Sequence, residues 1–351
     1  MTDALKLTTY FGERDRAGDR FLADALADLY AHHQLRTSLV LRGVAGFGVK
    51  HHLHTDRLLT LSEDLPMVSV AVDARARIEA VVDEVVALSG DGLITLERAR
   101  MADAAVVAAV GEEVKLTVHL GRGERADGRP AHIAVVDALH RHGVAGATVL
   151  LGVDGTVLGE RRRARFFAAN AQVPLMVIAV GARERIADAV AELRALPAEP
   201  LMTLERVRVC KRDGLRLGTP QPVAGTDPSG RAVWQKLMVY CGEQSRHAQR
   251  PLYSEIVRGL RSAGAAGATA LRGIWGYHGD HAPHGDTFWQ LRRRVPVITV
   301  VVDTPERIRR WFRIVDELTD ETGLVTSELV PAFRATGPEL ERGGLRLASR
   351  D

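Results

Sequence analysis

Three short stretches decide the fold: LKLT at residues 5–8, VKLT at residues 114–117 and QKLM at residues 235–238. In each case a glycine follows at the same distance, at Gly12, Gly121 and Gly242. The second stretch lies 109 residues after the first, and the third lies 230 residues after the first. Recurrence at constant offsets indicates an internal repeat, so the chain is predicted to contain three tandem copies of one domain.

Later landmarks keep the same order. A glycine stands at Gly43, Gly152 and Gly273, and a proline opens an apolar run at Pro66, Pro174 and Pro296. The copies end on ITLE at 94–97, MTLE at 202–205 and VTSE at 325–328. These landmarks predict domains at residues 1–101, 114–209 and 234–333, a linker at 210–233 rich in glycine and proline, and a flexible tail at 334–351.

Each copy predicts the same elements. In the first copy, apolar runs predict strands near residues 5–11, 36–44, 66–72 and 93–100, and helical spacing of apolar residues predicts helices near 21–29 and 78–86. The order is β-α-β-β-α-β, the ferredoxin-like α+β unit. Two helices cover only one face of such a sheet. Three copies are therefore expected to bury the other faces against one another in a pseudo-threefold assembly.

Composition excludes several classes of function. The formal net charge of +3 and the 5% aromatic content do not indicate a nucleic-acid binder. Two cysteines give no disulfide framework, which favours a reducing compartment, the cytoplasm. No signal peptide is evident, and no run approaches 18 apolar residues, so the protein is not expected to span a membrane.

One combination of motifs carries a family resemblance. The first copy reads RGVAGFG at residues 42–48, His-Thr at 54–55, Leu-Ser at 61–62 and Asp-Leu-Pro at 64–66. This combination resembles the PII-like family called domain of unknown function 190. The third copy keeps RGIWG at 272–276, whereas the second copy lacks the His-Thr and Leu-Ser elements.

The resemblance implies sensing rather than catalysis. PII-like proteins are ferredoxin-like homotrimers that bind small ligands, often adenine nucleotides, in clefts between subunits. Their long loop between strands two and three then contacts a regulated partner such as a transporter or an enzyme. The present chain is accordingly expected to be a monomer that acts as an intramolecular pseudo-trimer and binds a small anionic ligand. The candidate ligand-binding residues at matching positions are Arg42, Gly43, Gly46, Phe47, Gly48, His54, Gly152, Arg272, Gly273, Gly276 and His284.

The glycines admit two interpretations. The spacing of Gly43, Gly46 and Gly48 is not that of a dinucleotide fingerprint, and a loop follows rather than a helix. Their backbone amides either cradle a phosphate or form a tight turn where the strand ends. Arg42 and Arg272 precede the glycine and are candidates to bind phosphate through two N–H groups, while Leu151 stands there in the second copy.

A lysine recurs inside an apolar strand in every copy, at Lys6, Lys115 and Lys236. One interpretation places it in a cleft, where it binds phosphate as a point charge. The other is a lysine on an edge strand that blocks aggregation.

A His-x-x-His element is shared by two copies, as His51 and His54 and as His281 and His284. Imidazole pairs ligate divalent metals or hydrogen-bond phosphate, so a metal-binding module is the main alternative function; solvent-exposed polar loop residues are the plainer interpretation. The second copy has no histidine there, which predicts a silent site and fewer than three ligands per chain.

Two basic runs, at residues 161–163 and 292–294, admit two interpretations. They either dock an anionic ligand, a partner or nucleic acid, or form solvated faces, which is the commoner role of short charge runs. There is no Gly-x-Ser-x-Gly elbow, no phosphate-binding Gly-Lys-Ser/Thr loop and no Cys-x-x-Cys. The sequence therefore predicts a protein that is not an enzyme.

Overall fold

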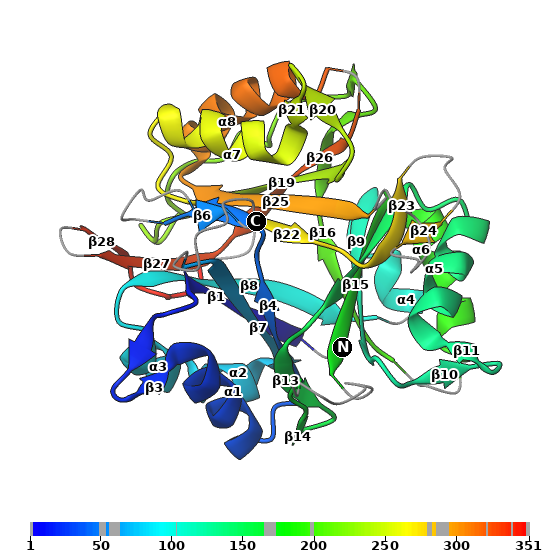
Figure 1. Cartoon of the computed structure of the whole chain (residues 1–351), viewed down its shortest axis with the longest axis horizontal. Coiled ribbons are helices and arrows are strands. Elements are labelled where there is room, and N and C mark those ends of the chain that lie inside the picture. Colours follow the sequence, from blue (N-terminus) through cyan, green and yellow to red (C-terminus); the bar gives the residue numbers. More distant parts are fainter. Residues whose placement is uncertain are drawn as a thin grey trace.

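The structure is a computed structural model that describes residues 3–48, 54–55, 64–102, 104–164, 173–196, 200–278, 283–285, 295–320, 322–337 and 340–348. The chain is α+β with three repeated units. We call residues 3–101 unit 1, residues 113–206 unit 2 and residues 234–330 unit 3. Helices lie at three outer corners and the strands fill the space between them (Figure 1).

The elements of unit 1 are β1 (Asp3–Gly12), β2 (Arg16–Ala17), β3 (Arg20–Phe21), α1 (Leu22–His32), β4 (Thr37–Arg42), β5 (Ala45–Phe47), β6 (His54–Thr55), β7 (Pro66–Ala74), α2 (Arg75–Glu79), α3 (Val82–Ser89) and β8 (Gly92–Met101). Between units 1 and 2 lies α4 (Ala104–Val107). Unit 2 comprises β9 (Glu113–Gly121), β10 (Arg125–Ala126), β11 (Arg129–Pro130), α5 (Ala131–Arg141), β12 (Gly146–Leu151), β13 (Asp154–Val157), β14 (Glu160–Arg161), β15 (Pro174–Ala182), α6 (Arg183–Leu193) and β16 (Leu201–Arg206).

After unit 2 come β17 (Arg208–Arg212) and β18 (Leu215–Arg216). Unit 3 comprises β19 (Trp234–Gly242), β20 (Arg246–His247), β21 (Arg250–Pro251), α7 (Leu252–Ser262), β22 (Ala268–Arg272), β23 (Trp275–His278), β24 (His284–Gly285), β25 (Pro296–Asp303), α8 (Pro305–Leu318) and β26 (Leu324–Val330). Two strands follow it, β27 (Ala332–Gly337) and β28 (Leu340–Gly343).

Local sequence explains the helices. In α7 the buried side chains Leu252, Ile256 and Leu260 recur at intervals of four residues, which gives one apolar stripe. α8 starts where the Thr304 hydroxyl accepts a hydrogen bond from the Arg307 N–H at 3.4 Å, with Pro305 in its first turn. The helix expected near residues 78–86 is split into α2 and α3 at Ala80, where the chain makes a turn.

The first strand of each unit is central in its sheet. β1 pairs with β7 on one side and with β8 on the other, all antiparallel. The order β4-β7-β1-β8 is repeated as β12-β15-β9-β16 and as β22-β25-β19-β26. This topology places the first and last strands of each unit side by side, which positions the candidate site described below.

Two seams of paired strands join the units. In the hairpin seam, the strand that continues each second strand pairs with the second strand of another unit: β5 with β22, β13 with β4 and β23 with β12. In the tail seam, the segment that ends or follows each last strand pairs with another last strand: the end of β8 with β16, β17 with β26 and β27 with β8. Each seam visits all three units, so the three sheets close on one another.

The described residues form four apolar cores. Each unit has a core between its helices and its sheet, containing for example Tyr30, Leu139 and Trp311. A fourth core is shared by the inner faces of the three sheets and contains Val70, Ile178 and Ile298. The second sheet face of each unit, whose burial the repeat predicts, is buried in this shared core.

The tail differs from its prediction as a flexible segment. β27 and β28 form an antiparallel pair, and β27 is hydrogen-bonded to β8 of unit 1. Phe333 is buried and stacks on Trp234 at 3.8 Å between ring centroids. The start of the expected linker differs too, because Cys210 lies buried in β17. No described helix is long and apolar enough to cross a membrane.

Candidate functional site

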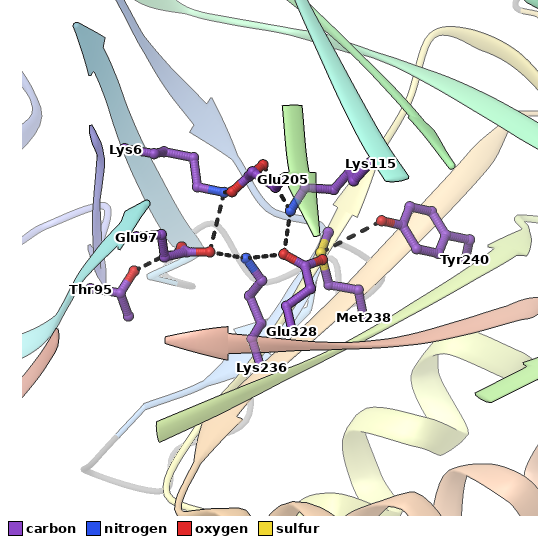
Figure 2. A network of polar contacts seen from close by, with 9 residues as sticks. All are labelled: Lys6, Thr95, Glu97, Lys115, Glu205, Lys236, Met238, Tyr240 and Glu328. Atoms are coloured by element: carbon purple, nitrogen blue, oxygen red, sulfur yellow. Dashed lines mark hydrogen bonds and ion pairs between the residues drawn. The ribbon is translucent and has the colours of Figure 1, made fainter. Parts of the chain in front are cut away.

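Six charged side chains form a closed ring where the three units meet (Figure 2). Each unit supplies one lysine from its first strand and one glutamate from its last strand; they are Lys6, Lys115, Lys236, Glu97, Glu205 and Glu328. Every lysine contacts the glutamate opposite it in its own sheet and the glutamate of another unit. We call this arrangement the ion ring.

Positive and negative side chains alternate around the ring. Within units, Lys6 lies 3.2 Å from Glu97, Lys115 lies 3.0 Å from Glu205, and Lys236 lies 2.9 Å from Glu328. Between units, Lys6 bonds Glu205, Lys115 bonds Glu328 and Lys236 bonds Glu97. The ring therefore holds three positive and three negative charges and is neutral as a whole.

Burial makes this arrangement electrostatically demanding. The ring residues are at most 9% exposed, and Lys115 is only 2% exposed. Burial alone raises the pKa of Glu97, but Lys236 and Lys6 outweigh it and lower that pKa to about 2. Burial likewise opposes the charge on Lys236, yet Glu328 and Glu97 raise its pKa well above the ordinary value.

The ring corrects both sequence interpretations of the lysines. Strand β1 lies between β7 and β8, so Lys6 is not on an edge strand. Its ammonium is buried against two carboxylates, so it does not face an open cleft as a free phosphate ligand. The glutamates were visible in the repeat as the last letter of ITLE, MTLE and VTSE, but no partner for them could be read from the sequence.

His119 breaks the threefold pattern beside the ring. Its equivalents are Tyr10 and Tyr240, which pair with Leu93 and Leu324 as His119 pairs with Leu201. The side chain is 5% exposed, and neither ring nitrogen has a hydrogen-bond partner among the described residues. Burial, with a smaller contribution from Lys6, lowers the pKa of His119 from 6.5 to about 4.

We expect this histidine to make stability depend on pH. Between pH 6.5 and pH 4 the unfolded chain binds a proton at His119 that the folded chain does not, so stability falls as pH is lowered through this window. The loss reaches about 3 kcal/mol at 1.36 kcal/mol per pH unit. Urea unfolding at pH 7, 6 and 5 measures the slope, which His119→Tyr should flatten. An equally steep fall in that variant would assign the pH dependence to other groups.

Gly43 and Gly46 belong to the hairpin seam rather than to a phosphate cradle or a tight turn, whereas an added Cβ on Gly48 would meet nothing within 4 Å. A Cβ on Gly46 would lie 2.6 Å from the Ala268 carbonyl oxygen, and one on Gly43 would lie 2.7 Å from Pro66. Gly155 and Gly276, the equivalents of Gly46, would each place a Cβ 2.1 Å from a carbonyl oxygen of another unit. Absence of a side chain here lets the backbones of two units approach closely enough to pair. Gly152 and Gly273 hold the position of Gly43, each donating its N–H to the carbonyl of the proline in its own unit.

The arginines ahead of these glycines are engaged by glutamates. Arg42 pairs with Glu13 at 2.9 Å, and its equivalent Arg272 pairs with Glu243 at 2.8 Å. In unit 2 neither partner is kept, because Leu151 and Arg122 stand at these positions. The described contacts therefore use both arginines to fix the start of the hairpin.

A cavity of about 160 Å³ lies between units 1 and 3; we call it the 1/3 cleft. Its walls are mostly apolar and include Tyr10, Leu93 and Val302. Phe47 and Gly48, both predicted from the sequence, also line it. Three carboxylates stand among its described lining residues, Asp15, Asp64 and Asp91, and that described lining contains no lysine or arginine.

The other two inter-unit positions differ. Between units 2 and 3 the cavity measures about 20 Å³, room for about one water. Its lining includes Tyr277, which stands where unit 1 has Phe47 and whose hydroxyl donates to the Val144 carbonyl at 2.9 Å.

Between units 1 and 2 the hairpin of β13 and β14 lies on α1. Arg161 bonds Asp28 and is mostly buried, which differs from the solvated face expected there, whereas Arg163 pairs with Asp24 at 2.9 Å and remains 57% exposed. The second basic run, 292–294, lies outside the described residues. The three inter-unit positions of the described chain are thus unequal.

Only part of the predicted histidine site lies among the described residues. His54 and His284 occupy equivalent positions, opposite Gly46 and Gly276 in their hairpins, and Arg162 takes that position opposite Gly155 in unit 2. His51 and His281 lie outside the described residues. In the part of the chain that is described, one cluster has metal-ligand spacing, Glu97 with Glu205 and Glu328, and its charge is already balanced by the three lysines.

Comparison with known proteins gives one family and several distant likenesses. The model of DUF190, described as "Uncharacterized ACR, COG1993", matches residues 4–101, 113–209 and 234–332. A "UPF0166 protein" from Aquifex aeolicus (strain VF5) is 29% identical over 100 residues, which is 28% of this chain and 92% of that protein.

The likenesses to solved structures are weak. An aspartate kinase from Synechocystis is 13% identical with a TM-score of 0.22, covering 96% of this chain and 45% of that one. An unknown protein from Galdieria sulphuraria is 10% identical with a TM-score of 0.18, covering 62% of this chain and 97% of that one. Scores of this size support no argument about function.

Proposed function

Since the chain belongs to the DUF190 family and carries three tandem copies of its domain, we propose that it is a non-enzymatic PII-like sensor whose 1/3 cleft binds a small organic ligand. The three units take the places of three ferredoxin-like subunits in a PII-like trimer. Ligand binding would alter the loops between the second and third strands, which contact a regulated partner protein such as a transporter or an enzyme.

The 1/3 cleft is the observation that supports this proposal. It combines apolar walls with acceptor carboxylates, an arrangement that suits a flat ring bearing N–H donors. An adenine base is such a ring, so adenine nucleotides and nucleosides are the first candidates. A purely anionic ligand is not favoured, because the described lining offers carboxylates and no cation.

The cleft also lies where a loop movement would start. Phe47 ends β5 and Gly48 follows it, and β5 pairs with β22 of unit 3 on one side and with β6 on the other. A ligand touching these residues contacts the base of the hairpin directly. Residues 49–53 and 56–63 of the same loop lie outside the described chain.

We expect one equivalent of ligand per chain. Thermal shift with adenosine, AMP and ATP should identify a binder, since a ligand at 100 times its Kd stabilises by about 2.7 kcal/mol. Calorimetry should then give a stoichiometry near one. Ala266→Phe, which fills the 1/3 cleft, should abolish binding, while the equivalent Ala145→Phe in unit 2 should not. Three equal sites for adenosine, or adenosine binding that survives Ala266→Phe, would refute the assignment.

We further expect the protein to be a monomer. The two seams and the shared core satisfy the inner sheet faces within one chain, so no second chain is needed to bury them. Light scattering on a sizing column should give a mass near 38.2 kDa. A mass of three chains would mean that the units exchange partners between molecules.

A further inference from the structure

A second and larger cavity, of about 590 Å³, lies on the other side of the ion ring. It shares no lining residue with the 1/3 cleft. All three ring glutamates line it, together with Val110 and Gln221 from the segments that connect the units. Its volume is in the range of sites for small metabolites. We call it the linker cavity.

The linker cavity is a property of this chain more than of its family. The family model matches the chain up to residue 101, from 113 to 209 and again from 234. Ala109 and Val110 come from the first unmatched segment, and Gln221 and Asp227 from the second. A relative of about one unit, such as the Aquifex aeolicus protein, has no equivalent of these connecting segments.

The second connecting segment is ordered over the cavity. The Asp227 carboxylate accepts hydrogen bonds from the N–H groups of Ser229 and Arg231 at 2.9 and 2.8 Å. The side-chain amide of Gln235, inside β19, donates to the Gln221 carbonyl at 2.7 Å. This wall is therefore built by specific contacts, although its sequence reads as an irregular linker.

Apart from the ion ring, the charged side chains that line the cavity are mostly positive: four arginines, Arg98, Arg100, Arg206 and Arg208, stand against one carboxylate, that of Asp227. The glutamates are neutralised by the lysines of the ion ring, whereas Arg100, Arg206 and Arg208 also line the cavity. Arg100 donates to the Ala109 carbonyl at 3.3 Å and Arg206 to the Val110 carbonyl at 2.9 Å. Within the described residues, none of these three guanidinium groups has an ion pair with a carboxylate.

The guanidinium groups of Arg100 and Arg206 lie close together, because they donate to the consecutive carbonyls of Ala109 and Val110. Arg206 and Arg208 also line a groove of about 730 Å³ that adjoins the cavity and shares Ala109 and Gln221 with it. Guanidinium groups bind phosphate through paired N–H donors, and each such charge-assisted bond is stronger than a neutral one.

We propose that the linker cavity binds a polyphosphorylated small molecule through Arg100, Arg206 and Arg208. The ring beneath it supplies a neutral floor, and the connecting segments supply the walls. This site differs from the 1/3 cleft in position and in charge. Adenosine, which has no phosphate, tests the 1/3 cleft alone, and tripolyphosphate, which has no base, tests the linker cavity alone, so either proposal can fail without the other.

Calorimetry with inorganic tripolyphosphate tests the proposal, with inorganic phosphate as the weaker probe. The double variant Arg206→Gln/Arg208→Gln should bind tripolyphosphate at least about tenfold more weakly, the loss of one charge-assisted contact. The matched control Arg125→Gln/Arg246→Gln removes the same charge from two exposed positions and should bind as the unaltered protein does. Equal weakening in both double variants would show adventitious attraction to a basic surface and overturn the site.

Two further variants keep the test decisive. Arg206→Lys/Arg208→Lys retains the charge but not the paired donors, and it should show intermediate affinity even if the glutamine variant folds poorly. Ala266→Phe should leave tripolyphosphate binding unchanged. Loss of tripolyphosphate binding in Ala266→Phe would place the anion in the 1/3 cleft and refute the linker cavity.

Discussion

Replacing Lys115 by methionine is expected to lower the free energy of unfolding by about 3–5 kcal/mol, the range found when one partner of a buried ion pair is removed. Lys115 is the ammonium shared by Glu205 and Glu328, and it is 2% exposed. Without it the ring holds three carboxylates and two ammonium groups, so one negative charge is left buried without compensation. Urea unfolding at pH 7 measures the loss.

A double variant separates charge from packing. Lys115→Met/Glu205→Gln removes one charge of each sign and leaves the ring neutral, so it should be more stable than Lys115→Met alone. Glu79→Gln, which breaks the exposed Arg75–Glu79 pair, should change stability by less than about 1 kcal/mol. If the double variant were as unstable as the sum of its single changes, the loss would come from packing and not from charge imbalance.

The use of lysine in the ring also indicates that these positions require a compact positive charge. Five of the chain's 47 lysine and arginine residues are lysines, and three of those five are in the ring. A compact ammonium can be shared by two carboxylates in a closed space, whereas a planar guanidinium is larger and requires a fixed fork geometry. Lys115→Arg is therefore a second variant that should destabilise the protein although it keeps the charge.

Gly155→Ala is expected to destabilise the protein by about 3 kcal/mol or more, through backbone strain of about 1–3 kcal/mol and overpacking of similar size. The residue has φ of +149°, and a Cβ would lie 2.1 Å from the Ser38 carbonyl oxygen. Ser38 belongs to unit 1, so the clash falls on the pairing of β13 with β4 that joins two units. The change should therefore weaken the junction between units and not only unit 2.

Gly225→Ala is the matched control, because no heavy atom lies within 4 Å of its added Cβ. It should change the free energy of unfolding by less than about 0.5 kcal/mol. Limited proteolysis adds a structural readout, since a loosened seam should expose the hairpin of unit 2 in Gly155→Ala alone. A stable Gly155→Ala variant with unchanged proteolysis would show that the backbones can separate without penalty.

The sequence predicted what is local or repeated. Constant offsets predict three copies, and apolar periodicity predicts most strands and helices of each copy, because both signals lie within short stretches. The recurrence of Lys6, Lys115 and Lys236 also marked positions of importance. Their role could not be predicted, because each lysine finds its second carboxylate in a unit distant in sequence.

The same limit explains the glycines and the tail. Gly46 looked like a turn residue or a phosphate cradle, yet the atom that demands a glycine is the carbonyl of Ala268, more than two hundred residues away. Residues after Phe333 looked mobile because their own sequence offers little to bury, and their pairing partner is the last strand of unit 1. The surroundings of Arg100 and Arg206 could not be predicted either. They are formed by connecting segments that do not recur in the chain, so the repeat gives no second copy with which to compare them.

The tail seam cannot close during biosynthesis until β27 has been made. β8 ends at Met101, but its partner β27 begins at Ala332, about 230 residues later. At about 5–20 residues per second, a ribosome needs roughly ten to fifty seconds to make that stretch. During this interval the nascent first unit has an open strand edge and an unfinished charge ring, and neighbouring nascent chains on one messenger carry the same surfaces. Folding in the cell is therefore expected to depend on keeping that edge covered until β27 has been synthesised.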